Sequence, residues 1–470
     1  MVNMKIALDP LKPISFKEQI VCQIEDMIRL RRAPVGTRLP SIRQLAAANK
    51  VSRFPVMEAY DLLVSRGLIE PRHGSGFYVT NCVDTLEHWP RGADPEVARA
   101  ESGQILRQFN AQGSTPPLSS GFIPPAWRDV EGIAQSVRQV SRTDIASLVD
   151  YAVPQGDLTL RKQISRRLSQ FEISAPSEQI LVTHSASHAL DLVTRMMLRP
   201  GDTVFVEDPG YFNLFGLLKL QGIQLVGVPR LHTGPDVDAM QTLLAIHRPK
   251  LFFVNTVFQN PTATNIAPQV AFRILQLAQQ HDFSIVEDDV YADLQPTPTQ
   301  RLATLDQLNR VIYVSGFSKT LSSSLRLGYV AAHADLIRDL IDVKTLTSMG
   351  GTRLAENVVA TLLERGVYRR HMEKLRHKVS DALMRTVDQL RRSGWETYEE
   401  PCGGMFVWAR VPHIDNSAHL VEHAARFGIN IAPGAHYRPN NQPSPWLRFN
   451  AAYMREGQTP AFLDSAANLA

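Results

Sequence analysis

Three kinds of hydrophobic pattern follow one another along the 470-residue chain. Near the N-terminus, apolar residues recur at helical spacing, as in Ile20, Ile24 and Ile28, and polar stops separate three such segments. From about residue 121, apolar runs of strand length alternate with helical stretches, which is typical of a mostly parallel sheet flanked by helices. Beyond about residue 345 come a long charged helix and a strand over 403–408. This succession predicts a multidomain protein.

The first eighty residues predict three short helices and a two-stranded wing. Ser15 and Glu18 form a capping-box pattern at the start of the first helix, Ser41 caps the second, and Ser52 opens the third. Residues 68–79 then supply two strands with a glycine-rich turn. Two short helices joined by a tight turn and followed by a wing form an α+β winged helix-turn-helix, whose third helix enters the major groove of DNA.

Within this unit, Arg53 is the candidate for reading bases, because an arginine fork can bond O6 and N7 of guanine together. Other residues carry hydroxyl, cationic or backbone N–H groups that suit phosphates: Ser41, Arg43, Ser52, Arg72, His73, Gly74 and Ser75. The alternative for any one of them is a helix cap or a solvated side chain.

Charge and composition favour a globular, DNA-binding protein over a disulfide-rich, secreted or membrane protein. Residues 1–80 carry 12 lysines and arginines against 7 acidic residues, and the rest of the chain carries 38 against 39, so the basic excess lies where DNA would bind. With 44% hydrophobic residues, the chain can bury a large core. Its three cysteines lie far apart, which argues against a disulfide framework or a metal site. No signal peptide or membrane span is evident, so we expect a cytoplasmic protein.

The N-terminal unit resembles the winged helix-turn-helix domain of the GntR family of regulators. The resemblance rests on the runs 38–46 (RLPSIRQLA), 51–53 (VSR), 67–69 (GLI) and 74–76 (GSG). It implies a transcriptional regulator that binds double-stranded operator DNA. Pro55 stands where the family usually has threonine, which leaves the base contacts at that position open.

The large C-terminal region carries the groups that pyridoxal 5'-phosphate requires. Lys319, after the strand over 311–314, can form the Schiff base, and Asp288 can keep the pyridine nitrogen protonated. Residues with suitable donors or an aromatic face complete the set: Asn260 and Tyr291 for the ring oxygen, Tyr211 for the ring face, and Ser185, Ala186, Ser187, Ser315, Ser318 and Arg326 for the phosphate. His184 and His188 are interpreted as polar loop or helix residues.

Residues 118–465 resemble the fold-type I aminotransferases. The resemblance is carried by the runs 207–211 (EDPGY), 260–262 (NPT), 288–291 (DDVY), 318–319 (SK) and 447–450 (LRFN). It implies an α/β domain with large and small subdomains, in which Arg448 binds an α-carboxylate and Tyr151 reaches the cofactor phosphate across the interface of a homodimer.

The whole chain resembles the MocR group of regulators. The resemblance implies a winged helix-turn-helix over 1–80, a linker over 81–118, a large subdomain over 119–345 and a small one over 346–470. It also implies a regulator that senses an amino acid or amine effector through its aminotransferase-like domain. The alternative is an active pyridoxal-phosphate-dependent aminotransferase with an accessory DNA-binding domain. A third option is an architectural DNA-binding protein without cofactor.

Overall fold

The computed structural model describes residues 6, 8–9, 14–29, 33, 35–72, 75–80, 103, 118–295, 299–454 and 458–469. The chain divides into two compact units, Met1–Gly92 and Ala93–Ala470. Of the linker expected over 81–118, only Gly103 and Leu118 are among the described residues. His73 and Gly74, two of the residues expected to contact DNA, also lie outside them.

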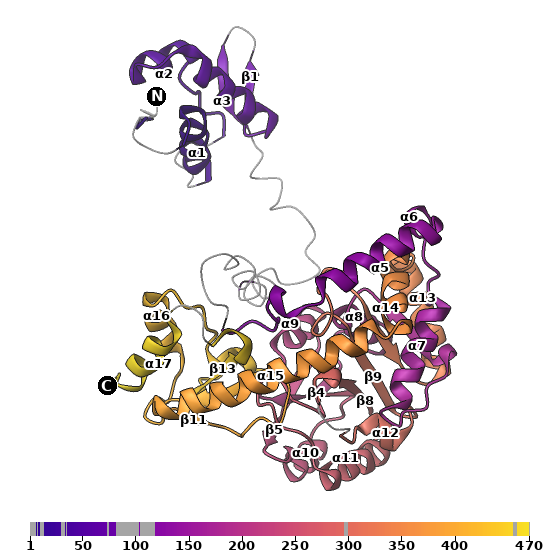
Figure 1. Cartoon of the computed structure of the whole chain (residues 1–470). Helices are drawn as coiled ribbons and strands as arrows, with labels where there is room; N and C mark the ends of the chain where they lie inside the picture. The colour runs from indigo at the N-terminus through magenta and orange to yellow at the C-terminus, as the bar shows by residue number, and fades with distance from the viewer. Residues whose placement is uncertain are drawn as a thin grey trace. The chain divides into compact units, whose positions relative to one another are not determined.

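The first unit is a winged helix-turn-helix, as the sequence predicts (Figure 1). Its elements are α1 (Phe16–Arg29), α2 (Ile42–Asn49), α3 (Arg53–Ser65), β1 (Ile69–Arg72) and β2 (Gly76–Val79), the two strands being antiparallel. The capping box of α1 is present: Ser15 N donates to Glu18 Oε2 at 2.9 Å, and Glu18 N donates to Ser15 Oγ at 3.2 Å. Ile20, Val56 and Tyr60 lie in the buried core that joins the three helices.

An eight-stranded sheet forms the centre of the second unit, in the order β3-β10-β9-β8-β7-β4-β5-β6. Strands β9, β8, β7, β4 and β5 are mutually parallel, whereas β10 is antiparallel to both of its neighbours. The bounds are β3 (Ile180–Thr183), β4 (Thr203–Asp208), β5 (Gln224–Leu231), β6 (Gly234–Pro235), β7 (Leu251–Val254), β8 (Ser284–Asp288), β9 (Val311–Gly316) and β10 (Gly328–Ala331). The mostly parallel sheet expected from the apolar runs is therefore present.

Successive residues of the central strands enter different cores on the two faces of this sheet. Phe252 and Val311 belong to one core, while their strand neighbours Phe253 and Ile312 belong to the other. The second of these cores includes residues of α8 (Ala186–Met197), α9 (Phe212–Leu220) and α13 (Ala334–Ser348). The first includes residues of α5 (Val130–Thr143), α7 (Leu158–Ser169), α10 (Val237–Leu244), α11 (Pro268–His281), α12 (Leu302–Asp306) and α14 (Arg353–Glu364). Two-sided burial explains why the strands are apolar throughout.

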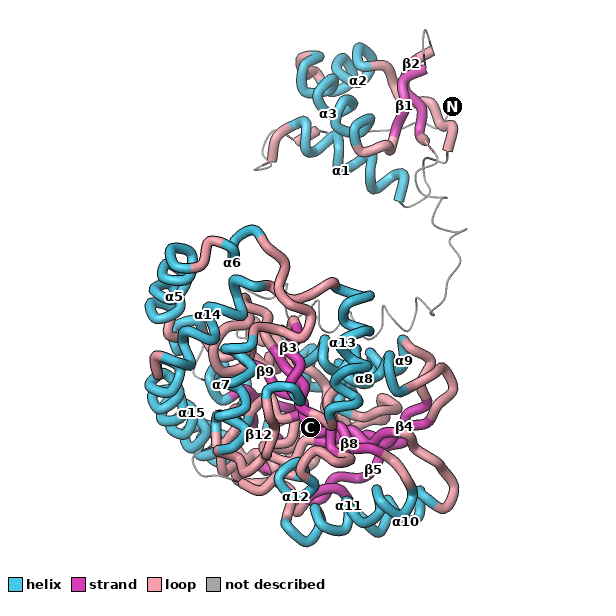
Figure 2. Tube along the Cα trace, turned by 90° about the vertical axis from the view of Figure 1, so that its right-hand side faces the viewer, coloured by secondary structure: helices cyan, strands magenta, loops and turns pink. Residues whose placement is uncertain are grey.

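A smaller antiparallel sheet, β11-β12-β13, lies near the C-terminus of the second unit (Figures 1 and 2). The long helix α15 (Val367–Arg392) leads into it, and α16 (Ala418–Arg426) and α17 (Thr459–Ala467) lie beside each other near it. The strands are β11 (Glu396–Thr397), β12 (Phe406–Arg410) and β13 (Trp446–Asn450). A four-residue helix, α6 (Ala146–Val149), follows α5. None of the helices in the described ranges has the length and hydropathy of a membrane span.

A buried lysine fixes the loop that precedes α7 to the edge of the sheet. Lys344 of α13 has no exposed surface, and its Nζ donates to the carbonyl oxygens of Pro154 at 2.5 Å and Val182 at 2.9 Å. Glu356 of α14 accepts a hydrogen bond from the backbone N–H of Asp157 at 2.7 Å. Two buried charged side chains therefore determine the path of residues 154–157.

We expect the Lys344→Met variant to lose a pH dependence of stability. Burial lowers the pKa of Lys344 to about 8, whereas an unfolded lysine has a pKa of about 10.4. Because the folded-state pKa is the lower one, the unfolded chain binds more protons between these two values, and the free energy of unfolding rises with pH across that window. Thermal denaturation between about pH 7 and about pH 10 should show the wild type gaining roughly 2 kcal/mol over the variant.

The matched control is Lys374→Met, at an exposed position of α15. This variant should follow the wild-type curve. Parallel curves for Lys344→Met and the wild type would contradict the assigned titration.

Candidate functional site

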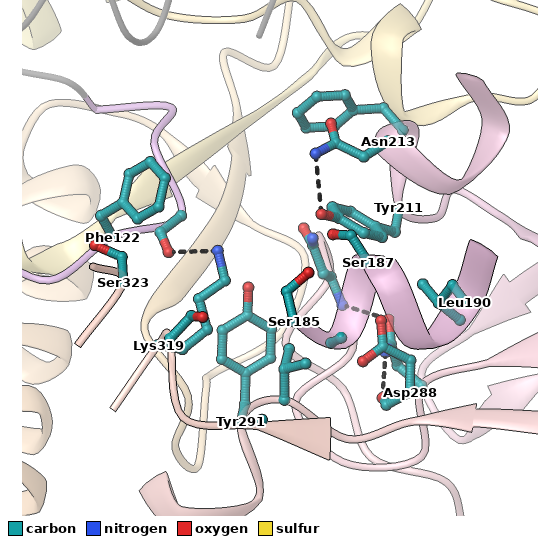
Figure 3. Close-up of a pocket in the computed structure, with 18 of the residues that line it drawn as sticks. Phe122, Ser185, Ser187, Leu190, Tyr211, Asn213, Asp288, Tyr291, Lys319 and Ser323 are labelled. Atoms are coloured by element: carbon teal, nitrogen blue, oxygen red, sulfur yellow. Dashed lines mark hydrogen bonds between the residues drawn. The ribbon is translucent and has the colours of Figure 1, made fainter. Parts of the chain in front are cut away.

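Most of the candidate site residues lie where strands of the large sheet end. Ser185 follows β3, Asn255 follows β7, Asp288 ends β8, and Lys319 comes shortly after β9. The carboxyl ends of these parallel strands meet at one edge of the sheet, where ligands bind in open α/β folds. The side chains line a cavity of about 250 Å³ (Figure 3).

Lys319 lies in this cavity and contacts the entry segment, by which we mean residues 118–128. Its Nζ donates to the carbonyl oxygen of Gly121 at 2.9 Å and lies 4.7 Å from the ring centroid of Phe122. Burial, together with the nearby Arg448 cation, lowers the pKa of Lys319 to about 8. A lysine with a lowered pKa presents more of the neutral amine, which is the form that attacks a carbonyl carbon.

Asp288 lies in the cavity and provides a half-buried carboxylate that is incompletely hydrogen-bonded. Its Oδ1 has no hydrogen-bond partner among the described residues. Burial and the adjacent Asp289 carboxylate raise the pKa of Asp288 to about 7, against the opposing effect of Lys319. An unsatisfied acceptor in such surroundings suits a cationic N–H donor, such as the protonated nitrogen of a pyridine ring.

The N-terminus of α8 forms one wall of the cavity. The Ser185 hydroxyl caps this helix by accepting a hydrogen bond from the backbone N–H of His188 at 3.1 Å. Ala186 and Ser187 in the first turn line the cavity together with Arg326. The buried Ser318 hydroxyl there has no hydrogen-bond partner in the described part of the chain. The free N–H groups and positive dipole end of a helix suit a phosphate.

Ser315 does not fit the phosphate role that the sequence suggested. Its hydroxyl donates to the carbonyl oxygen of Asp289 at 2.8 Å, and the residue is absent from the cavity wall. Successive residues of a strand face opposite sides of the sheet, so on β9 Ser315 and its neighbour Gly316 lie on opposite faces. Gly316 borders the cavity instead.

The remaining residues expected around a cofactor ring also border the cavity. Tyr211 accepts a hydrogen bond at its hydroxyl from Asn213 Nδ2 at 3.0 Å, and Figure 3 shows Ser187 beside it. Burial raises the pKa of Tyr211 to about 12, so its hydroxyl stays protonated. Tyr291 is buried and packs edge-on against Phe406. An aromatic face and a phenol donor are therefore available on the same cavity.

Arg448 of β13 brings a buried cation from the smaller sheet into the cavity. Its Nη1 donates to Asn260 Oδ1 at 2.6 Å, its Nη2 donates to the carbonyl oxygen of Ser119, and its guanidinium lies 4.1 Å from the ring centroid of Phe406. All of these partners are neutral, and Nε has no hydrogen-bond partner among the described residues. The guanidinium charge is therefore available to a carboxylate ligand.

Tyr151, like Ser315, is an expected cofactor contact that is absent from the cavity wall. It is 80% exposed, close in sequence to Val149 and Val153, which are also exposed. Leu346 and Met349, at the C-terminal end of α13, are exposed as well, and a Cβ on Gly350 would lie 2.7 Å from the Ala152 carbonyl oxygen. These side chains come from two segments that meet where Gly350 approaches Ala152, and they are called the exposed apolar patch below.

The histidines of the α8 segment form a pair outside the cavity wall. His188 Nδ1 accepts a hydrogen bond from the backbone N–H of His184 at 3.2 Å, and the two rings are stacked with centroids 5.0 Å apart. Burial lowers the pKa of His188 to about 4, so the imidazole is neutral at physiological pH. The structure is consistent with their interpretation as polar loop and helix residues.

In the first unit, the N-terminal turn of α3 is open to solvent. Ser52 and Arg53 are exposed, and the Ser52 side chain makes no capping hydrogen bond. Ser41 differs, because its hydroxyl caps α2 by accepting a hydrogen bond from Gln44 N at 3.3 Å. Phe54 is 62% exposed beside Arg53, which adds an apolar surface that could meet a thymine methyl group.

Polar side chains of the wing make contacts with other residues of the wing. Arg72 is exposed, pairs with Glu70 at 2.8 Å and lies over the ring of Tyr78. Ser75 Oγ lies 2.5 Å from the Tyr78 hydroxyl. Arg43 on α2 is exposed. Arg38 approaches the wing at Gly76 and adds an exposed cation that sequence reasoning missed.

Several lining residues of the cavity were also missed by sequence reasoning. They come from the entry segment and from positions next to the recognised motifs: Gly121, Phe122, Leu190, Phe212, Asn213, Asn255, Val290, Gly316 and Ser323. Their residue types carry no specific signal for this chemistry. Asn255 could have been singled out because a polar residue directly follows the apolar strand β7. Its side chain donates to the carbonyl oxygen of Asp288.

The fold and the cavity define an aminotransferase-type domain joined to a DNA-binding regulatory domain. The chain belongs to the family of class I and II aminotransferases, which it matches over residues 117–465. Residues 16–79 match the gntR family of bacterial regulatory proteins. The expected GntR and MocR architecture is thus confirmed: the chain is a GntR-type DNA-binding regulator fused to an aminotransferase-like domain.

Similar proteins include both regulators and transaminases. The chain is 28% identical to the HTH-type transcriptional regulator YdfD of Bacillus subtilis, with 94% of each chain covered, and 29% identical to YdcR of Escherichia coli, with 93% and 95% covered. It is 29% identical to a 2-aminoadipate transaminase of Thermus thermophilus over 78% of its length and 94% of the transaminase. Among solved structures, Pyrococcus horikoshii kynurenine aminotransferase matches with a TM-score of 0.76 and 23% identity, covering 82% of this chain and 97% of that one.

Proposed function

We propose that this regulator holds pyridoxal phosphate in the cavity around Lys319 and uses it to sense an amino acid or amine. The observation that carries the proposal is the convergence of Lys319, Asp288 and Arg448 on one cavity in a chain that also has a DNA-binding unit. The regulators to which the chain is similar span both units, whereas the transaminase lacks a match to the whole chain. A regulator of this kind acts on DNA in the cytoplasm.

The unsatisfied polar atoms of the cavity support the cofactor assignment. When bound, pyridoxal phosphate supplies an aldehyde that condenses with a primary amine of the protein or of a ligand. Lys319 is the amine, Asp288 pairs with the ring nitrogen, and the first turn of α8 with Ser318 and Arg326 holds the phosphate. Arg448 then orients the α-carboxylate of an amino acid through its guanidinium.

A homodimer is part of this proposal. The exposed apolar patch around Tyr151 includes Val149, Val153 and Leu346, the last being 88% exposed. Large exposed apolar patches mark protein interfaces, and a second copy is the partner that would place Tyr151 near the phosphate of the neighbouring cavity. Sedimentation of the purified protein at several concentrations tests this. A monomer at all of them would overturn the dimer.

The experiment that tests sensing follows two signals during one titration. Candidate amino acids and amines are added to the purified protein while the visible absorbance of the cofactor and the affinity for DNA upstream of the protein's own gene are recorded. We expect at least one ligand to change both, because only a ligand that binds two states with different affinities can shift their populations. A ligand that alters the absorbance but leaves DNA affinity and footprint unchanged would contradict sensing.

The second candidate function is transamination, which the complete set of Lys319, Asp288, Tyr291 and Arg448 around one cavity favours. Steady-state turnover with a panel of amino acids and 2-oxo acids separates the two functions. Rates of roughly 1 to 1,000 per second are usual for enzymes. Such rates would make catalysis the main function. Turnover far below them would support regulation as the main function.

For the DNA-binding unit, we expect different results from Arg53→Ala and Arg43→Ala. Both side chains are exposed, but only Arg53 lies in the first turn of α3, which faces the base edges in this class of domain. Arg53→Ala should relax sequence preference by about 1–3 kcal/mol at one base pair. Arg43→Ala should weaken binding to every sequence and reduce the salt dependence. Binding assays with operator and random DNA at several salt concentrations measure both effects, and equal losses on both DNAs from both variants would refute these roles.

A further inference from the structure

Arg128 lies beside the cavity and has no part in the function proposed above. It follows the short helix over Pro125–Trp127, in the segment that also supplies Gly121 and Phe122. Its Nη1 donates to Ser323 Oγ at 3.3 Å and its Nη2 donates to the Ile123 carbonyl oxygen at 3.4 Å. Both distances are at the long end for a hydrogen bond. The guanidinium is therefore only weakly held.

The charge of Arg128 lacks a partner within the described part of the chain. Its Nε is buried and makes no hydrogen bond there, and none of the ion pairs found there includes Arg128. A guanidinium keeps its charge in proteins, and a partly buried cation without an anion is unfavourable. By contrast, the half-buried Arg353 pairs with Asp144, and Arg438 pairs with Asp208 through two hydrogen bonds. An external anion would complete the surroundings of Arg128.

The proposed function gives a role to each charged side chain of the cavity wall but none to Arg128. Asp288 is the one acidic residue among the described lining residues, against the cations Lys319, Arg326 and Arg448. In the proposed function, Lys319 reacts with the cofactor, Arg326 meets its phosphate, Asp288 meets its ring nitrogen, and Arg448 meets the α-carboxylate of the ligand. Arg128 is close enough to the cavity to help lower the pKa of Lys319, after burial and Arg448. Its charge matches a further negative group on the ligand.

Ser323, which accepts a hydrogen bond from Arg128, indicates where on the ligand the further negative group lies. Figure 3 shows Ser323 and Phe122 on the side of Lys319 away from Asp288 and Tyr211. Asp288 and Tyr211 are the residues assigned to the cofactor ring, so the cofactor occupies their side. The side of Ser323 and Phe122 is left for the side chain of the ligand, and Arg128 lies behind Ser323.

We propose that Arg128 binds a carboxylate on the side chain of the amino acid effector, so that the cavity selects acidic amino acids. This inference rests on the proposed function, because it presumes that an amino acid occupies the cavity. Ser323 can donate its hydroxyl to the same carboxylate, and the Phe122 ring covers the intervening methylene groups. An Arg–carboxylate contact of this kind accounts for roughly a tenfold to hundredfold preference over the uncharged amide.

The test compares acids with their amides on the cofactor-loaded protein. L-aspartate and L-asparagine, L-glutamate and L-glutamine, and L-2-aminoadipate are titrated, with the dissociation constant measured by calorimetry and by the change in cofactor absorbance. We expect one acid to bind at least tenfold more tightly than its amide. Arg128→Met should abolish this preference by weakening the acid and not the amide, and Arg128→Lys should retain part of it. Arg138→Met, on the exposed face of α5, should leave both constants unchanged.

The outcomes separate this inference from the function on which it rests. If amides or apolar amino acids bind and change the absorbance as well as the acids do, the role of Arg128 is overturned and sensing stands. If the acid preference persists in Arg128→Met, the inference is likewise overturned, and another cation provides it. If no amino acid binds in either measurement, the sensing function fails and the inference fails with it.

Discussion

Replacing Lys319 with alanine is expected to abolish the ligand response while the protein remains folded and bound to DNA. The Nζ amine is the group in the cavity suited to covalent attachment of the cofactor, and it donates one hydrogen bond to the Gly121 carbonyl oxygen. Loss of that single bond costs about 1 kcal/mol, which a unit of this size tolerates. The variant should lack the visible absorbance of a covalently held cofactor, and ligands should no longer alter its affinity for DNA.

Two comparisons make this result specific. Lys374→Ala, at an exposed position of α15, should behave as the wild type in absorbance and in DNA binding. Thermal denaturation of Lys319→Ala should show little change, since the hydrogen bond to the Gly121 carbonyl oxygen is a small loss. DNA binding should persist because the winged unit has its own core of Ile20, Val56 and Tyr60. A wild-type protein that never shows the absorbance when supplied with cofactor would remove the cofactor from the proposed function.

The winged unit was predictable because its elements are local. The capping box of Ser15 and Glu18, the cap at Ser41 and the helical spacing of Ile20 and Ile24 depend on neighbours within a few residues. Whether a serine at the start of a helix uses its hydroxyl as a cap was not predictable in the same way. The sequence does not distinguish Ser41, which is occupied as a helix cap, from Ser52, which makes no such hydrogen bond.

In the second unit, the parallel sheet was predictable because strands buried on both faces are apolar throughout, as in Leu251–Val254. Asp288 and Lys319 come at or after the ends of such strands, so the sequence also predicted that they meet at the carboxyl edge of the sheet. The direction of single side chains was harder to predict. Ser315 and Ser318 look equivalent in the sequence, yet Ser315 donates to Asp289 within the core while Ser318 borders the cavity. Ser315 is still within β9, whereas Ser318 follows the end of the strand at Gly316, so the two hydroxyls meet different surroundings.

Contacts between distant parts of the chain were beyond prediction. The Gly121 carbonyl oxygen meets Lys319 across 198 residues, and the Ser119 carbonyl oxygen meets Arg448 across 329. Arg128 likewise lies in a stretch without a recognisable motif, and its position beside Ser323 follows only from the fold. The entry segment thus completes the cavity between the large sheet and the smaller one. A ligand that contacts this segment touches the first continuous stretch of described residues in the second unit, which begins at Leu118.

Replacing Gly328 with alanine is expected to disrupt the proposed phosphate site more than any change of a polar residue there. Gly328 begins β10 and pairs with Gly316 of β9. A Cβ at Gly328 would lie 2.4 Å from the Ser185 carbonyl carbon and 2.5 Å from the Ala186 nitrogen, both of them backbone atoms. These atoms cannot move aside without shifting the first turn of α8. We expect a loss of roughly 3 kcal/mol in stability, at the upper end for overpacking.

Gly316→Ala provides a graded comparison at the paired position. Its Cβ would lie 3.0 Å from the Leu327 carbonyl oxygen and 3.7 Å from the Ala186 nitrogen, so a shift of a few tenths of an ångström suffices. The expected loss of stability is about 1 kcal/mol.

Thermal denaturation measures the stability of both variants, and dialysis followed by absorbance measures retention of the cofactor. The proposed phosphate site uses the N–H groups of Ala186 and Ser187, which requires the helix end to keep its position, so Gly328→Ala should release the cofactor first. Equal retention by Gly328→Ala and the wild type would show that the phosphate lies elsewhere.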